Sequence, residues 1–172
     1  GLMVTHEGPF ERLGGSKRGM KFITKIPPLI AVPTTAGTGS EVSPGAVVIL
    51  DNGMKETFVS AFLVPVAAVC DPELTLGLPP ALTAATGMDA MTHCIEAVLT
   101  PVVHPPAEAI GVDGAERIGK WLERAVKDGS DRDARWHMMM GSFEGALAFA
   151  KGLGAVHGLS HALGRIHELK LH

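Results

Sequence analysis

The sequence has little cysteine, no excess of positive charge and no long apolar run. Its two cysteines, Cys70 and Cys94, are too few for a disulfide framework and predict reduced thiols in a cytoplasmic protein. With 15 Lys and Arg against 18 Asp and Glu, the net charge is −3, which argues against a nucleic-acid partner. No apolar run approaches the roughly 18 to 20 residues that cross a membrane, so we expect no membrane partner either.

The composition that remains is that of a globular protein. Hydrophobic residues make up 46% and charged residues 19% of the 172 positions, enough for a buried core in one domain or in pieces of two. The chain begins with Gly1-Leu2-Met3 and stops at His172 without a helix-ending signal. We therefore expect an incomplete chain.

The two halves of the sequence follow different periodicities. Short apolar runs separated by turns predict strands at residues 28–33, 46–50, 54–59 and 64–70. The first run is apolar on both sides, which is typical of a strand buried on both faces of a parallel sheet. After Pro79-Pro80 the apolar spacing becomes helical and predicts helices at residues 82–99, 107–126, 131–150 and 156–163. The chain is thus expected to divide into residues 1–79 and an all-helical part, residues 80–172.

Two pairs of side chains at helical spacing carry the clearest chemistry. Asp89 and His93 are four residues apart, as are His157 and His161, and such residues share one helix face. One carboxylate with imidazoles from two helices forms most of a divalent metal site, and this donor set suits Fe(II) and Zn(II) alike. Two other interpretations stay open: a buried, hydrogen-bonded Asp–His pair, and histidines that lie in the core or face solvent.

The hydroxyl-rich loop at residues 34–41 follows the first expected strand. Gly37 and Gly39 permit close backbone approach, and four neighbouring residues carry hydroxyl groups, an arrangement that suits phosphate or ribose contacts. The loop is neither a P-loop nor the dinucleotide-binding fingerprint, so a purely structural turn explains it equally well.

Four segments together resemble the iron-containing (group III) alcohol dehydrogenase family. They are PTTAGTGSE at residues 33–41, DPEL with LPP within residues 71–80, GMDAMTHCIEA at residues 87–97 and GAVHGLSHALG at residues 154–164. The resemblance implies an α/β nucleotide-binding domain, incomplete here at residues 1–79, followed by an all-α metal-binding domain at residues 80–172. This architecture is like that of dehydroquinate synthase.

The resemblance also implies a metal site of iron, Fe(II), or zinc, Zn(II). Asp89, His93 and His157 match three of the family's four protein ligands. Leu171 occupies the position where the family's spacing places the fourth, a histidine, so His172 is the expected fourth ligand unless that ligand lies beyond the end of the chain.

The remaining implied roles concern the cofactor, NAD or NADP, and proton exchange. His161 matches a histidine near the nicotinamide and the substrate, which makes it a candidate for proton transfer. The residues expected to line the cofactor site are Thr34, Thr35, Thr38, Ser43 and Lys55. The family's glycine-rich pyrophosphate motif is absent, and residues 14–16 lie too close to the hydroxyl loop to replace it.

The implied reaction is reversible hydride transfer between NAD(P) and a primary alcohol, its aldehyde or a hydroxy acid. The metal would act as a Lewis acid on the substrate oxygen, and the family suggests a homodimer. Two alternatives remain: a catalytically incompetent fragment with residual metal binding, and a sister enzyme similar to glycerol dehydrogenase.

Overall fold

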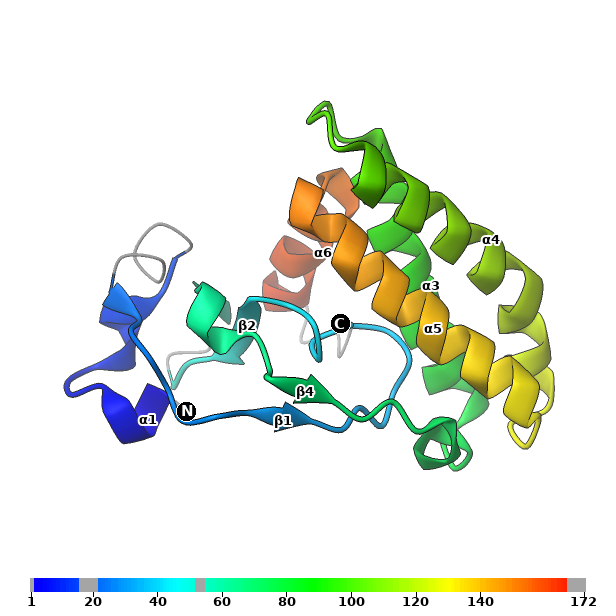
Figure 1. Cartoon of the computed structure of the whole chain (residues 1–172), viewed down its shortest axis with the longest axis horizontal. Coiled ribbons are helices and arrows are strands. Elements are labelled where there is room, and N and C mark those ends of the chain that lie inside the picture. The colour runs from blue at the N-terminus through cyan, green and yellow to red at the C-terminus, as the bar shows by residue number, and fades with distance from the viewer. Residues whose placement is uncertain (1, 16–21, 52–54, 167–172) are drawn as a thin grey trace.

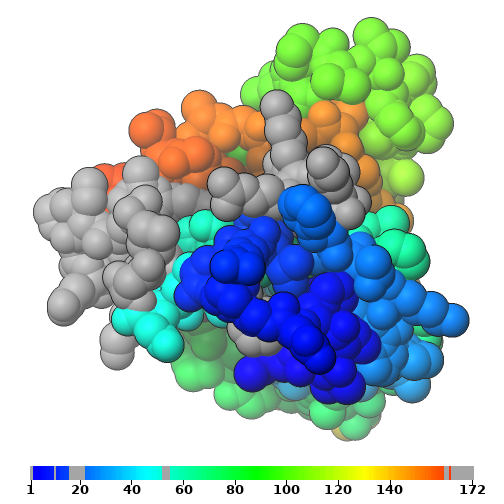
Figure 2. All heavy atoms as spheres, turned by 90° about the vertical axis from the view of Figure 1, so that its left-hand side faces the viewer, coloured from blue at the N-terminus to red at the C-terminus, as the bar shows by residue number. Residues whose placement is uncertain are grey.

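The computed structural model describes residues 2–15, 22–51 and 55–166, and it divides visibly into a helical bundle and a strand-containing part (Figure 1). The bundle comprises α3 (Pro80–Leu99), α4 (Pro105–Lys127), α5 (Arg132–Ala148) and α6 (Ala155–Ile166). Short elements make up much of the rest: α1 (Leu2–Thr5) and single 3-10 turns at Phe10–Leu13, Ala61–Leu63, Pro72–Thr75 and Phe149–Lys151. Figure 2 looks at the end opposite the bundle, where the N-terminal segment covers the centre of the face.

The strands form two separate two-stranded sheets. β1 (Ile30–Ala31) pairs in parallel with β4 (Ala67–Ala68), and β2 (Gly45–Ile49) pairs antiparallel with β3 (Lys55–Val59). The parallel pairing agrees with the sequence pattern, but the expected burial of the first strand on both faces is wrong for this chain. Ile30 is 62% exposed and both residues of β4 are exposed as well, because a parallel strand is buried on both faces only where helices cover both faces of its sheet.

The helices begin where the sequence supplies suitable first-turn residues. α3 has Pro80 in its first turn, where a missing backbone N–H costs no hydrogen bond. At the start of α4, Nδ1 of His104 accepts a hydrogen bond from the backbone N–H of Ala107. At the start of α5, the Asp131 carboxylate accepts one from the N–H of Ala134. Among the described residues, no helix has both the length and the apolar character needed to cross a membrane.

The core lies between α3, α4 and α5, and small residues bring these helices close together. Cys94 of α3 is fully buried, and a Cβ placed on Gly114 of α4 or Gly145 of α5 would lie 2.8 Å or 3.0 Å from its Sγ. Ile118 and Met138 fill the space further along the bundle. This packing fixes α3 in the bundle, and α3 carries the residues on which the site is built.

Candidate metal centre

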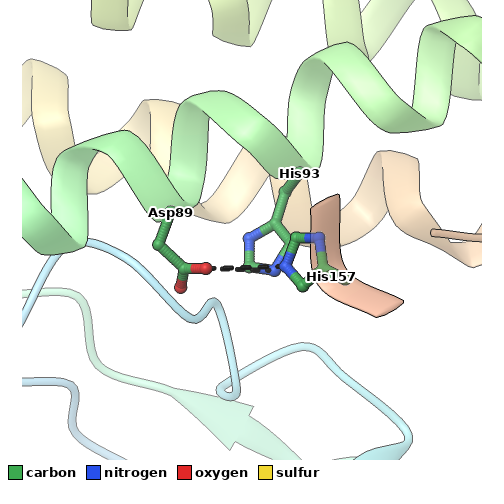
Figure 3. A group of neighbouring side chains, drawn as sticks. All are labelled: Asp89, His93 and His157. Carbon is green, nitrogen blue, oxygen red and sulfur yellow. Dashed lines mark ion pairs between the residues drawn. The ribbon is translucent and has the colours of Figure 1, made fainter. Parts of the chain in front are cut away.

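Three of the residues expected to bind a metal come together where α3 meets the start of α6 (Figure 3). Asp89 and His93 project from successive turns of α3, and His157 reaches them from the first turn of α6. One potential ligand atom from each residue lies within 4.8 Å of the others. Oδ1 of Asp89 is 3.5 Å from Nε2 of His157 and 3.9 Å from Nε2 of His93.

The geometry disfavours the two simpler interpretations of these residues. At 3.9 Å, Asp89 and His93 are too far apart for a hydrogen bond. His157 is only 9% exposed, so it does not face solvent, and its ring stacks on that of His93 with centroids 4.5 Å apart. Nδ1 of His93 is buried and makes no hydrogen bond of normal geometry within the described part of the chain. A core histidine would normally be satisfied there.

The donor set therefore fits a divalent metal ion. A carboxylate and two imidazoles are ligands that both Fe(II) and Zn(II) accept, and imidazole binds a metal only when the binding nitrogen is unprotonated. Burial lowers the pKa of His93, an effect that the Asp89 carboxylate and, more weakly, the Gly37 carbonyl oppose. Hydrogen bonding to Asp89 raises the pKa of His157; burial opposes this shift, while Glu96 adds to it.

Glu96 is a buried residue at this site that the sequence analysis did not single out. Its carboxylate lies 2.6 Å from Nδ1 of His157 and also accepts hydrogen bonds from the backbone N–H groups of Gly154 and Val156. Burial alone would raise the pKa of Glu96, but the hydrogen bonds from Gly154, His157 and Val156 outweigh it and lower the pKa. A glutamate between Ile95 and Ala97 was the available signal, because a buried carboxylate needs partners.

The hydroxyl loop lies against the helices, and this contact explains its glycines. A Cβ on Gly37 would lie 2.7 Å from Cβ of Thr86 on α3. Gly39 has φ +58°, and a Cβ there would lie 2.1 Å from Cβ of Ala146 and 3.0 Å from the carbonyl oxygen of Ser142, both on α5. Close backbone approach was expected for a phosphate or a ribose. In the structure the two glycines instead leave room for α3 and α5 to pack against the loop.

The residues expected to line the cofactor site differ in exposure. Thr34 and Thr38 are exposed and Thr35 is half-buried, so their hydroxyl groups lie at or near the surface. Ser43 is buried, and its Oγ accepts a hydrogen bond from the N–H of Gly45 at the start of β2. Lys55 is half-buried at the start of β3. Their contacts with a cofactor stay predictions.

Two further predicted residues are only partly covered by the structure, or not at all. The backbone of His161 belongs to α6, one turn beyond His157, but its side chain is not among those described. His172 lies outside the described residues. The proton-transfer role of His161 and the ligand role of His172 therefore stay predictions, as does the division of the chain at residues 79 and 80.

Comparison with known proteins gives the site its context. Residues 1–72 match the family model described as iron-containing alcohol dehydrogenase, and residues 83–170 match the C-terminal model of the Fe-containing alcohol dehydrogenase family. The chain belongs to the iron-containing alcohol dehydrogenase family. A 4-hydroxybutyrate dehydrogenase from Cupriavidus necator is 58% identical over 95% of the chain and 43% of the relative.

Solved structures of several oxidoreductases share the fold. A crystal structure of 1,3-propanediol oxidoreductase superposes with a TM-score of 0.92 at 37% identity, over 98% of this chain and 44% of that one. Sulfoacetaldehyde reductase from Bifidobacterium kashiwanohense, solved in complex with NAD+, gives 0.85 at 32% identity, over 96% and 44%. The expected fold class is confirmed. The chain spans less than half the length of each of these relatives.

Proposed function

We propose that this chain is part of a metal-dependent oxidoreductase that oxidises a primary alcohol with NAD(P)+ to give an aldehyde, NAD(P)H and a proton, reversibly. The observation that carries the proposal is the convergence of Asp89, His93 and His157 within 4.8 Å at the meeting of two helices. The membership of an alcohol dehydrogenase family supports the reaction class.

The protein ligands of the metal, iron or zinc, are proposed to be Asp89, His93, His157 and, as the fourth, His172. A bound divalent ion would supply a Lewis acid for the alcohol oxygen. Asp89 contributes the negative charge of the site, and the two histidines contribute neutral donors whose rings stack against each other. Together they fix where the substrate oxygen is held.

The nicotinamide cofactor is proposed to lie along the hydroxyl loop. Thr34, Thr35 and Thr38 carry hydroxyl groups at or near the surface of this loop. A Cβ on Gly37 would lie 2.7 Å from Cβ of Thr86, which precedes Asp89 by three residues on α3, so the loop borders the metal centre. The reductase relative solved with NAD+ supports this cofactor class. Ser43 and Lys55 complete the proposed cofactor contacts, and the proposal covers NAD and NADP alike.

The proton released on alcohol oxidation is proposed to leave through His161. An imidazole exchanges protons readily near neutral pH, because its unperturbed pKa is about 6.5. His161 follows the proposed ligand His157 by four residues, about one turn of α6.

The proposed substrates are short molecules with a primary alcohol or aldehyde at one end and a polar group at the other, including hydroxy acids. The names of three relatives support this class: a 4-hydroxybutyrate dehydrogenase, a 1,3-propanediol oxidoreductase and a sulfoacetaldehyde reductase. We further propose that the protein is a homodimer in the cytoplasm. The two free cysteines support the proposed location.

Metal content tests the proposal. The full chain is purified without added chelator, and iron and zinc are measured by mass spectrometry. We expect about one ion per chain at a single site and its loss in His157→Ala. His104→Ala is the matched control, because His104 is exposed, caps α4 and is not among the residues whose ligand atoms converge. Undiminished metal in His157→Ala would contradict the ligand assignment.

A second reading is that the chain alone is catalytically incompetent and binds metal only weakly. The observation that favours it is the coverage, since the chain spans 43% of the 4-hydroxybutyrate dehydrogenase. A calorimetric titration of the chain with NAD+ distinguishes a working enzyme from an incompetent fragment. Saturable binding supports a working cofactor site in these 172 residues, and its absence assigns the activity to a longer protein.

A further inference from the structure

Glu96 links the metal centre to the start of the helix that carries His157. Its side chain is buried on α3, one turn after His93, and the residue is 6% exposed. Oε2 lies 2.6 Å from Nδ1 of His157 and accepts the Gly154 N–H at 2.9 Å. Oε1 accepts the N–H of Val156 at 2.6 Å. One carboxylate thus holds both the ring of His157 and the backbone before it.

We propose that Glu96 is a positioning residue of the metal centre, which fixes the tautomer and the orientation of His157 and anchors the first turn of α6. This inference rests on the proposed metal site. Glu96 is not proposed to contact the metal, because its oxygens are already directed at α6.

The tautomer follows from hydrogen-bond chemistry. An ionised carboxylate only accepts hydrogen bonds, so Nδ1 of His157 carries the hydrogen and donates it to Glu96. When the imidazole is neutral, the other nitrogen is then the unprotonated one, and only an unprotonated nitrogen binds a metal. That nitrogen, Nε2, lies 3.5 Å from Oδ1 of Asp89, on the side where the ligands converge. Partners of this kind orient metal-binding histidines and make them more basic.

The fit between Glu96 and the start of α6 is close. A Cβ on Gly154 would lie 2.9 Å from Oε1 and 3.1 Å from Cδ of Glu96. A glycine at this position therefore allows the carboxylate to reach the backbone N–H groups. The negative charge also lies at the N-terminal end of α6, where the helix dipole favours it. Gly154→Ala displaces the carboxylate without changing its chemistry and offers a second, independent test.

His93 provides an internal contrast. Its Nδ1 makes no hydrogen bond of normal geometry within the described part of the chain, whereas Nδ1 of His157 is held by a buried carboxylate. The Gly37 carbonyl influences His93 but makes no hydrogen bond of normal geometry with its Nδ1, so the stronger hydrogen-bond support is on the ligand that comes from α6. Loss of Glu96 should weaken metal binding through His157 and through no other ligand.

A double-mutant cycle with Co(II) tests the inference. Co(II) affinity of the full chain is measured by competition with a chelator, and the visible absorption of the bound ion reports its coordination geometry. We expect Glu96→Gln and Gly154→Ala each to weaken Co(II) binding about 10- to 100-fold and to alter the spectrum. In the His157→Ala background, Glu96→Gln should have no further effect.

Asp131→Asn is the matched control, because Asp131 caps α5 and touches none of the three metal-centre residues. Its Co(II) affinity should equal that of the unmodified chain. Undiminished Co(II) affinity in Glu96→Gln, alongside weak binding by His157→Ala, would overturn the role of Glu96 and leave the metal centre standing. Equal weakening by Glu96→Gln with and without His157 would reduce Glu96 to a general fold-stabilising residue. If the unmodified chain binds no Co(II), the metal centre and the role of Glu96 fail together.

Discussion

Oδ1 of Asp89 and Nε2 of His157 lie 3.5 Å apart, although one belongs to α3 and the other to α6. Two complete helices, α4 and α5, separate them in the sequence. Asp89 and His93 are brought together by the repeat of a single helix, but the third residue arrives only when α6 packs against α3. Binding of a metal at this point should therefore stabilise the contact between the two helices.

Metal-linked stability is the first prediction. A ligand that binds only the folded state, present at 100 times its Kd, stabilises that state by about 2.7 kcal/mol. We expect Zn(II) to raise the Tm of the chain in thermal unfolding followed by circular dichroism, and Asp89→Asn to lose this response. Asp113→Asn removes an exposed carboxylate on α4 and serves as control. A full Zn(II) response in Asp89→Asn would contradict the prediction.

Substitution of Gly39 tests the docking of the hydroxyl loop. Gly39→Ala places a methyl group against Ala146 and Ser142 at a residue with φ +58°, so we expect a loss of about 2 to 4 kcal/mol from overpacking and backbone strain. Urea unfolding gives the free energy. Gly77→Ala is the control, since a Cβ there meets nothing within 4 Å and the predicted change is small. Equal stability of the two variants would show that the loop does not depend on this contact.

Arg135 joins the start of α3 to α5 through a buried guanidinium. Nη1 donates to Oγ1 of Thr83 at 2.8 Å, Nη2 to the carbonyl of Leu78 at 3.2 Å and Nε to the carbonyl of Gly129 at 3.0 Å. A lysine keeps the charge but cannot make the three hydrogen bonds of the planar guanidinium. Arg135→Lys should therefore lower the free energy of unfolding, measured in urea, by about 1 to 3 kcal/mol. Arg132→Lys, at an exposed ion pair with Glu73, should change stability by less than about 0.5 kcal/mol.

His137 should titrate below the ordinary histidine pKa of about 6.5. Burial lowers the pKa of its imidazole, as does the charge of Arg117, whose Nη1 donates to Nδ1 at 3.2 Å. The folded state therefore disfavours the protonated ring. The stability that His137 contributes is fully present above pH 6.5 and is lost as the pH falls through its folded pKa.

Fluorescence measures this titration directly. His137 stacks on Trp121 with centroids 4.1 Å apart and meets Trp136 edge-on at 4.7 Å, and these are the two tryptophans of the chain. We expect a fluorescence transition with a midpoint below pH 6.5 that His137→Asn abolishes. A midpoint at or above 6.5 would contradict the expected shift.

The secondary structure followed well from the sequence where the signals were local. Helices were expected at residues 82–99 and 107–126, and α3 and α4 lie within a few residues of those bounds. The apolar spacing was less informative about burial. Met88 and Ile95 were consistent with a helical apolar pattern, yet they are 52% and 45% exposed. Periodicity shows which residues share a face, but not which face another element covers.

The sequence by itself determined the family, the helices and the placement of Asp89 and His93 on one helix face, because helical spacing and motif order are properties of the chain alone. Only the tertiary structure decided that His157 lies beside Asp89 and His93 and that Glu96 contacts the ring of His157. It also decided that α3 and α5 pack closely against Gly37 and Gly39. These contacts join residues far apart in the sequence. Their distances depend on how closely the small residues of the bundle let the helices pack, and no local pattern encodes that.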